Sequence, residues 1–200
     1  MSTFTPGFRG RGRTVGHRIP PGQYQTADFP VLSAGPTPAV DLEEWTFTVV
    51  SEVGERREWD WEQFSELPAE NPTVDIHCVT RWSKLDTTWR GVSVDTLLAE
   101  VDTAADFAVV HSVDGYTANL PVEDISDGQA WVVTEYEGEP LPAEHGGPVR
   151  FLVPHLYFWK SAKWVTAITL HDEDQPGFWE RAGYHDYGDP WLEQRYQPGW

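Results

Sequence analysis

Short runs of β-branched and aromatic residues, separated by turn signals, recur along most of the chain and constrain its fold more than any other feature. Such runs are typical of strands. They lie at residues 45–50, 74–80, 107–113, 116–120, 131–136, 149–153 and 163–170. Two short helices are expected between them, one after Asp60 and one beginning at Ser93 or Asp95, because these side chains cap helix N-termini. The elements show no regular β-α-β alternation, so the sequence predicts an α+β fold of mixed sheets with short helices.

The N-terminal part differs in composition from the rest of the chain. Residues 1–44 are rich in proline and glycine and include RGRGR at 9–13 and PPG at 20–22. This composition favours an extended arm over helices. We expect the arginines of RGRGR to lie in a flexible, solvated tail, whereas Phe29-Pro30-Val31-Leu32 is apolar enough to pack on the body. The prediction is therefore an arm over residues 1–44 and a single domain over residues 45–200.

The charge balance excludes some classes of partner. The chain has 32 acidic and 14 basic residues, for a net charge of −18. A field of this sign repels phosphate, so nucleic acid is not expected as a partner. The scarcity of lysine points in addition to a saline, halophilic cytoplasm, where salt screens self-repulsion. No segment reaches the roughly 18 apolar residues of a membrane helix, and the early arginines lack the apolar run of an export signal, so we expect a cytoplasmic protein.

Cys78 is the only cysteine, which excludes an intramolecular disulfide and a multi-cysteine metal cluster. The alternation of residues 74–80 places it at or just past the end of a strand. A lone cysteine is often a small buried hydrophobe, and it can also be a nucleophile or a soft metal ligand. Basic neighbours favour a thiolate because positive charge lowers a thiol pKa; they are His77, Arg81, Lys84 and Arg90. A nucleophile is the least favoured alternative, since no cysteine hydrolase signature surrounds Cys78.

A second group of residues suggests an anion site. The segment HGGPVR at 145–150 combines small residues with Arg150, and PHLYFWKSAKW follows at 154–164. Small residues allow close approach of backbone N–H groups, and the basic side chains supply donors for a phosphate or a polyoxygenated heterocycle. The alternative is a surface turn before an edge strand that lysines protect from aggregation. The acidic residues and histidines between 171 and 186 could bind a hard metal, but solvated loops explain them better.

Three motifs, in this order, resemble the molybdopterin-binding domain of the sulfite oxidase family, which includes the molybdenum subunit of the bacterial periplasmic methionine sulfoxide reductase. They are HCVTRWS (77–83) with WRGV (89–92), EGEPLPAEHGGPVRFLVP (137–154) and KSAKWV (160–165). The resemblance extends over about residues 20–195. It implies a sulfite-oxidase-type α+β fold and a molybdenum–molybdopterin cofactor.

The resemblance also implies roles for individual residues. Cys78 matches the cysteine whose thiolate binds molybdenum, and Tyr184 in FWERAGY matches the active-site tyrosine. Arg81 is a candidate contact for an anionic substrate, from its charge and position. The residues expected to hold the pterin and its phosphate are Phe29 in the arm segment 29–33, Ser112, His145, Arg150, Ser161, Ala162 and Lys163.

The function implied is two-electron oxygen-atom transfer at a Cys-ligated molybdenum centre, on a sulfite-like anion or an S- or N-oxide. Two alternatives stay open: a non-catalytic protein that stores or delivers the pterin, and a metal-free thiol protein. The chain ends soon after the last motif, without the C-terminal β-sandwich or haem domain of sulfite oxidases, so we expect a separate electron carrier. Thr80 and Arg81 depart from the periplasmic reductase pattern.

Overall fold

The structure is a computed structural model that describes residues 18–199. The RGRGR segment lies outside these residues. The strands are β1 (Tyr24–Gln25), β2 (Thr46–Val50), β3 (Arg56–Asp60), β4 (Ala69–Glu70), β5 (Thr73–His77), β6 (Trp82–Ser93), β7 (Phe107–Ser112), β8 (Thr117–Pro121), β9 (Trp131–Tyr136), β10 (Glu139–Pro140), β11 (Arg150–Leu152) and β12 (Val165–His171). The helices are α1 (Trp61–Ser65) and α2 (Val94–Leu98), with 3-10 turns η1 (Val122–Asp124), η2 (Ala143–His145), η3 (Phe158–Lys160) and η4 (Glu180–Ala182).

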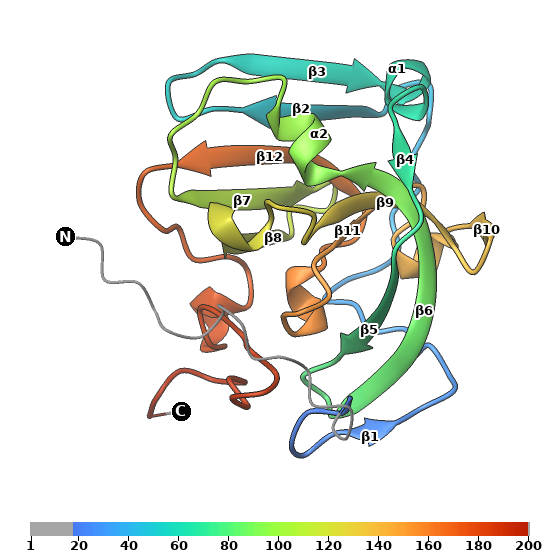
Figure 1. Ribbon diagram of the computed structural model, residues 1–200, viewed down its shortest axis with the longest axis vertical. Helices are drawn as coiled ribbons and strands as arrows, with labels where there is room; N and C mark the ends of the chain where they lie inside the picture. The colour runs from blue at the N-terminus through green and yellow to red at the C-terminus, as the bar shows by residue number, and fades with distance from the viewer. Residues whose placement is uncertain (1–17, 200) are drawn as a thin grey trace.

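The strands form two sheets (Figure 1). One is five-stranded in the order β3-β2-β12-β7-β8. The other is built around the long, curved strand β6, which pairs with β1, β4, β5 and β9, while β9 also pairs with β10 and β11. Parallel pairs (β12 with β2, β1 with β6) occur among antiparallel ones. The fold is therefore α+β with mixed sheets, as the sequence predicts.

The hydrophobic core has two parts. The larger cluster includes Phe47 and Trp59 from the five-stranded sheet and Val132 and Phe151 from the other sheet, all at most 2% exposed. Burial of this apolar surface is the main force that holds the sheets together. The smaller cluster contains Cys78 together with buried residues of β5, β6, β9 and η3. Cys78 thus lies in a well-packed part of the protein and not in an exposed loop.

Most of the predicted elements are confirmed. Asp60 caps α1 through a capping box with Gln63, and Ser93 caps α2. Strand β5 ends at His77, so Cys78 follows directly after a strand. The sequence analysis missed β3 and β6, because charged residues interrupt the apolar pattern of both strands, and β3 has only one buried side chain.

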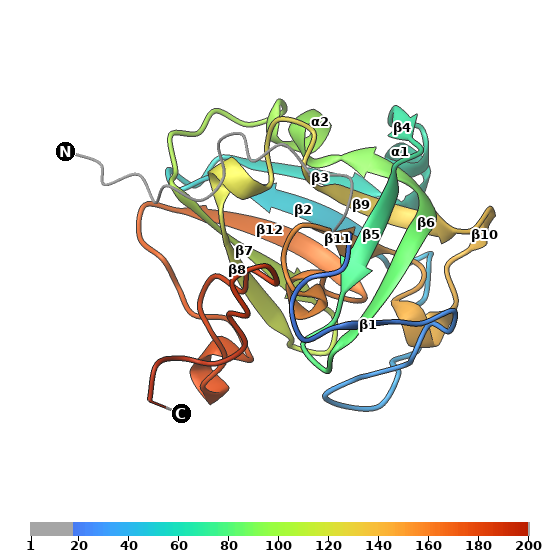
Figure 2. The same ribbon diagram turned by 60° about the horizontal axis from the view of Figure 1, so that its bottom comes forward.

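The N-terminal arm wraps around the end of the sheet built on β6 (Figures 1 and 2). Within the arm, β1 pairs with β6 in register Tyr24↔Trp82. Arg18 donates two hydrogen bonds to Asp75 at 2.6 and 3.1 Å and also bonds Asp86. These contacts fix the start of the described arm beside β5 and β6. Residues 29–34, which follow, lie near Cys78 at the end of β5. None of the helices in residues 18–199 has the length and hydrophobicity of a membrane span.

Candidate functional site

A cavity of about 310 Å³ lies beside Cys78, a size typical of small-molecule sites. Its walls come from five parts of the chain: the arm, the turn after β5, the hairpin between β7 and β8, the segment from η2 to Trp164, and the C-terminal tail. Eight of the residues expected at a cofactor site line it: Phe29, Cys78, His145, Arg150, Ser161, Ala162, Lys163 and Tyr184. The structure therefore brings together residues that lie as many as 155 positions apart in the sequence.

Cys78 is held in a tight turn between β5 and β6. Its backbone N–H donates to Trp82 O at 2.8 Å, and its carbonyl accepts from Arg81 N at 3.0 Å. The thiol sulfur lies 3.2 Å from Thr80 Oγ1, within hydrogen-bond distance. Both Cys78 and Thr80 line the cavity. The turn thus presents a single sulfur ligand from a rigid backbone.

The electrostatic environment of this thiol differs from the expectation. Burial raises the pKa of Cys78, and the Thr80 hydrogen bonds and the charges of Arg150 and Arg195 offset only part of this effect. The basic residues near Cys78 in sequence make other contacts: Lys84 bonds Ala27 O, Arg90 pairs with Glu135 at 3.3 Å, and His77 bonds Ser83 at 2.8 Å. The prediction that neighbouring residues lower this pKa is wrong. A metal would have to displace the thiol proton.

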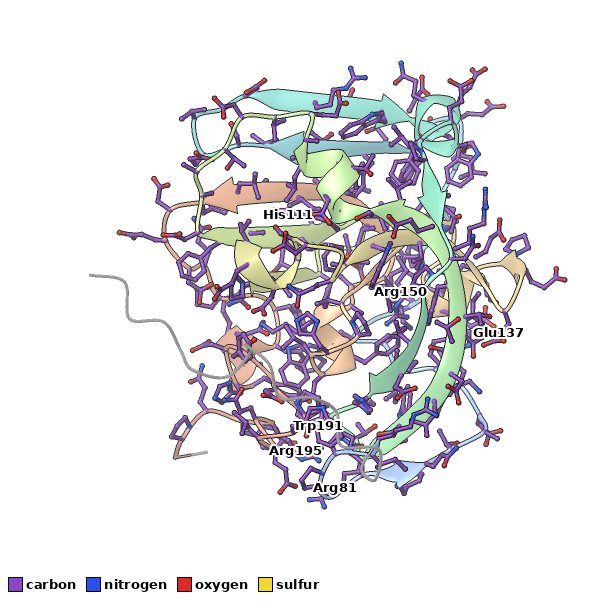
Figure 3. All side chains as sticks on the ribbon, viewed as in Figure 1. Arg81, His111, Glu137, Arg150, Trp191 and Arg195 are labelled. Carbon is purple, nitrogen blue, oxygen red and sulfur yellow. The ribbon has the colours of Figure 1, made fainter. Side chains whose placement is uncertain are left out.

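Arg150 is the main positive charge of the cavity and comes from the start of β11 (Figure 3). It is only 3% exposed, and its guanidinium stacks 3.9 Å from the centroid of the Phe158 ring. The carbonyls of His145 and Ser161 each accept one of its N–H groups at 2.8 Å. Its Nε is buried without a hydrogen-bond partner, and no carboxylate in residues 18–199 forms a salt bridge with it.

A buried, uncompensated charge is costly, and burial accordingly lowers the pKa of Arg150. An anion in the cavity would relieve this cost. Arg150 therefore favours a phosphate or another anionic group as the ligand.

Lys163 and His145 line the cavity together with Arg150. Lys163 Nζ donates to Glu144 O at 2.6 Å and to Ser33 Oγ in the arm at 2.9 Å. The His145 ring stacks on Phe29 with centroids 3.9 Å apart, which fixes the arm against the HGGPVR segment. Burial and the charge of Arg150 lower the pKa of both Lys163 and His145. Phe29 and Ser33 of the arm therefore line the cavity together with Lys163 and His145.

Gly146 and Gly147 allow a close approach of the backbone in the HGGPVR segment, where a side chain would not fit. A Cβ at Gly147 would lie 2.0 Å from Leu141 O, and Gly146 has φ +110° with Lys163 Cβ 3.0 Å from the position of its missing Cβ. Trp164 lies in the cavity wall with φ 52°, a conformation that is rare and strained for a bulky residue. Strained backbone of this kind gathers at ligand sites.

Aromatic residues around Tyr184 form another part of the cavity wall. Tyr184 contacts Trp179 at a ring centroid distance of 4.8 Å and Trp159 at 5.1 Å. Trp159 Nε1 donates to Glu180 Oε1 at 2.7 Å, and the same oxygen pairs with the buried Lys160 at 2.7 Å. Lys160 is thus structural: it ties η4 to η3 instead of binding a ligand. Burial raises the pKa of Tyr184, so its hydroxyl stays protonated at neutral pH.

Two of the expected site residues lie outside the cavity wall. Arg81 has φ 80° in the turn after Thr80, and its side chain is exposed. Ser112 is buried at the end of β7 with no hydrogen-bond partner for its Oγ among the described residues, while Asp114 and Tyr116 line the cavity beside it. The chain turns at residues 113–115, and Asp114 and Tyr116, not Ser112, are the residues of this hairpin that line the cavity.

Sequence reasoning missed several lining residues, notably Trp159, Trp164 and Trp179. The unusual number of tryptophans, 11 in the whole chain, is the only signal that could have indicated them. The loop acids and histidines at 171–186 do not form a metal site: no group of three His, Cys, Asp or Glu gathers among residues 18–199.

Comparisons with known proteins agree with this geometry. The family described as oxidoreductase molybdopterin binding domain matches residues 34–179. The chain is 42% identical over 182 residues to the uncharacterized oxidoreductase YuiH of Bacillus subtilis, covering 90% of this chain and 92% of that protein. It is 35% identical over 74 residues to rat mitochondrial sulfite oxidase, covering 36% and 14%. It is 25% identical over 181 residues to the protein-methionine-sulfoxide reductase catalytic subunit MsrP of Pseudomonas syringae, covering 80% and 52%.

A solved structure shares the fold. The sulfane dehydrogenase SoxCD of Paracoccus pantotrophus superimposes with a TM-score of 0.62 at 18% identity, covering 69% of this chain and 41% of that chain. At this identity the likeness establishes the fold alone. The described chain therefore corresponds to nearly all of the Bacillus protein and to about half or less of the longer enzymes.

Proposed function

Because the chain belongs to the oxidoreductase molybdopterin-binding domain family of sulfite-oxidase-like proteins, and so binds a molybdenum–molybdopterin cofactor, we propose that it catalyses oxygen-atom transfer at a molybdenum held by Cys78. The observation that supports the proposal is the cavity itself, whose wall combines one sulfur donor, Cys78, with the uncompensated Arg150 and with aromatic residues that include Tyr184.

The residues present fit the cofactor. Arg150 lacks a counter-ion, Lys163 and His145 lie beside it, and Gly146 and Gly147 leave room for close approach. These residues would hold the pterin and its phosphate, with Ser161 positioned by its Oγ, which accepts from Val153 N at 3.0 Å, and its carbonyl, which accepts from Arg150. Cys78 would supply one thiolate to the metal, a soft ligand suited to molybdenum.

When bound, the cofactor supplies the two-electron exchange of an oxygen atom. The chain's own residues bind and orient the substrate. Tyr184 would donate a hydrogen bond to the oxygen of the substrate, since its hydroxyl stays protonated. Trp159 and Trp179 would exclude water and contact the apolar groups around the reacting atom.

The aromatic end favours an S- or N-oxide over a sulfite-like anion as substrate. Among residues 18–199, the lysine and arginine of the cavity wall, Lys163 and Arg150, belong to the pterin end, and Arg81 is exposed. Tyr184 and its ring neighbours Trp159 and Trp179 are uncharged, so this part of the wall itself offers no cation to a dianion. A neutral, dipolar oxide requires none.

A separate electron carrier completes the proposal, because the described residues offer no second metal-cluster site. The carrier would exchange electrons with the molybdenum between turnovers.

Turnover assays test this function. Purified protein should contain stoichiometric molybdenum and reduce dimethyl sulfoxide, methionine sulfoxide or trimethylamine N-oxide with a reduced dye. Tyr184→Phe should keep the molybdenum and lower turnover by about ten- to a thousandfold, the range expected for loss of one donor in the transition state. Molybdenum without turnover of any sulfoxide, N-oxide or sulfite would instead indicate a cofactor storage or delivery protein. A Tyr184→Phe enzyme with unchanged kinetics would contradict the role of this hydroxyl.

A further inference from the structure

The turn that carries Cys78 is held by both ends of the described chain. From the N-terminal arm, Gln23 Nε2 donates to Cys78 O at 3.0 Å. From the C-terminal tail, Arg195 Nη1 donates to Val79 O. The carbonyls of two successive residues are thus fixed by side chains that lie more than 50 positions away in opposite directions. The sequence analysis did not select Arg195, and the family match ends before it, at residue 179.

Arg195 is built into the protein and is not a surface side chain. It is 8% exposed, and its guanidinium lies 5.0 Å from the centroid of the fully buried Tyr157 ring. Tyr157 in turn forms a β-bridge with His77, the last residue of β5. The Arg195 carbonyl accepts from His185 N at 3.2 Å, which holds the tail in place. The side chain therefore contacts the Cys78 turn from a fixed position.

The charge of Arg195 is not neutralised locally. Within residues 18–199, its one salt-bridge partner is Glu193, whose Oε1 is 3.9 Å from Nη2 and whose side chain is 49% exposed. Arg195 Nη2 is buried without a hydrogen bond. The charges of Arg150 and Arg195 both act to lower the pKa of Cys78, against the larger effect of burial. Figure 3 shows Arg195 close to the end of the protein that also carries Arg81 and Trp191, away from Arg150.

We propose that Arg195 is a positioning residue for the metal-ligating Cys78: it fixes the 78–81 turn through Val79 O and places a positive charge near the cysteine. The proposal rests on the function proposed above. Arg81 is much nearer to Cys78 in the sequence, but its side chain is exposed. The proposal therefore gives the positioning role to Arg195. A positive charge near the sulfur stabilises the more negative, reduced state of the centre, so its loss should lower the reduction potential.

The test compares holoprotein variants by molybdenum content, the Mo(V) paramagnetic signal and the midpoint potential. Arg195→Met should shift the Mo(V) signal and move the equilibrium toward the oxidised state by about tenfold, which is about 30 mV for a two-electron couple. Arg195→Lys, which keeps the charge, should restore the potential toward the wild-type value. The matched control is Arg181→Met, because Arg181 lies on the same tail, is exposed and bonds Pro176 O, away from the Cys78 turn.

An Arg195→Met protein with wild-type signal and potential would overturn the proposal. If Arg195→Met loses its molybdenum or fails to fold, Arg195→Gln and Arg195→Lys decide: a lower potential in the glutamine variant than in the lysine variant supports the proposal, and equal potentials overturn it. Wild-type protein without molybdenum would overturn the proposed function and this proposal with it. Wild-type molybdenum with indistinguishable variants overturns this proposal alone.

Discussion

Arg150 places a positive charge inside a strongly acidic protein without a carboxylate beside it. Its guanidinium is satisfied in part by two backbone carbonyls and by the Phe158 ring, so the remaining charge is directed toward the cavity. Burial raises the pKa of the Cys78 thiol, so the metal that we propose for this site would have to displace its proton. At the scale of single residues, Arg150 therefore favours an anionic group in the cavity, and Cys78 offers a sulfur atom that suits a metal.

We expect Lys163 to make cofactor retention depend on pH. Burial, followed by the charge of Arg150, lowers its pKa to about 8, below the value of about 10.4 in an unfolded chain. Between these two values the folded, empty protein binds fewer protons than the unfolded chain, so this lysine contributes stability as pH rises. Anion binding requires the charged form and has the opposite dependence: it weakens as pH rises through about 8.

We therefore expect pterin release from loaded protein to increase between about pH 7 and about pH 10, the interval over which a lysine with this pKa loses its charge. Fluorescence of the pterin recovered after gel filtration measures the release. Lys163→Arg, which stays charged throughout, should flatten the profile. A Lys163→Arg profile as steep as that of the wild type would show that another group is responsible.

The elements place these residues through a few close backbone approaches. Strands β6 and β9 shift register at Arg90/Gly91, and a Cβ at Gly91 would lie 2.4 Å from Val132 O and 2.5 Å from Val133 Cα. The sheet that carries Cys78 therefore depends on the glycine of the WRGV motif for its packing against β9.

Gly91→Ala should destabilise the protein by about 3 kcal/mol, because the contacted atoms belong to the backbone and cannot move aside cheaply. Denaturant unfolding of wild type and variant measures the change. Gly35→Ala is the control, since no atom lies within 4 Å of its added Cβ. Equal unfolding midpoints for Gly91→Ala and wild type would refute this account of the β6–β9 contact.

Prediction from sequence succeeded where a local pattern determines the structure. The strand ending at His77, the Asp60 cap and the HGGPVR segment are all local, and each was located from its own residues. It failed where tertiary contacts decide. Strand β6 has too many charged residues for a clear pattern, and Arg195 acts on a turn 116 residues away. Arg81 was selected for its charge and its position near Cys78, and the structure places it in a turn with φ 80°, exposed and outside the cavity wall.

At the scale of the whole molecule, the net charge of −18 contrasts with a cavity whose wall carries Arg150 and Lys163. The overall field opposes compaction through self-repulsion, and salt screens this repulsion over about 8 Å at physiological ionic strength. The midpoint of thermal unfolding should therefore rise between low salt and molar KCl. A midpoint that is unchanged or lower in KCl would contradict adaptation to a saline environment.

The most direct test of the central claim, that Cys78 binds molybdenum, is elemental analysis combined with the Mo(V) signal on partial reduction. It compares wild type and Cys78→Ser made in a host competent for the cofactor. The account predicts one molybdenum per wild-type chain with a Mo(V) signal, and loss or marked alteration of that signal in Cys78→Ser while Thr80→Val, a neighbour that also lines the cavity, retains the metal. Wild-type protein without molybdenum, or a Cys78→Ser variant with the wild-type signal, would contradict it.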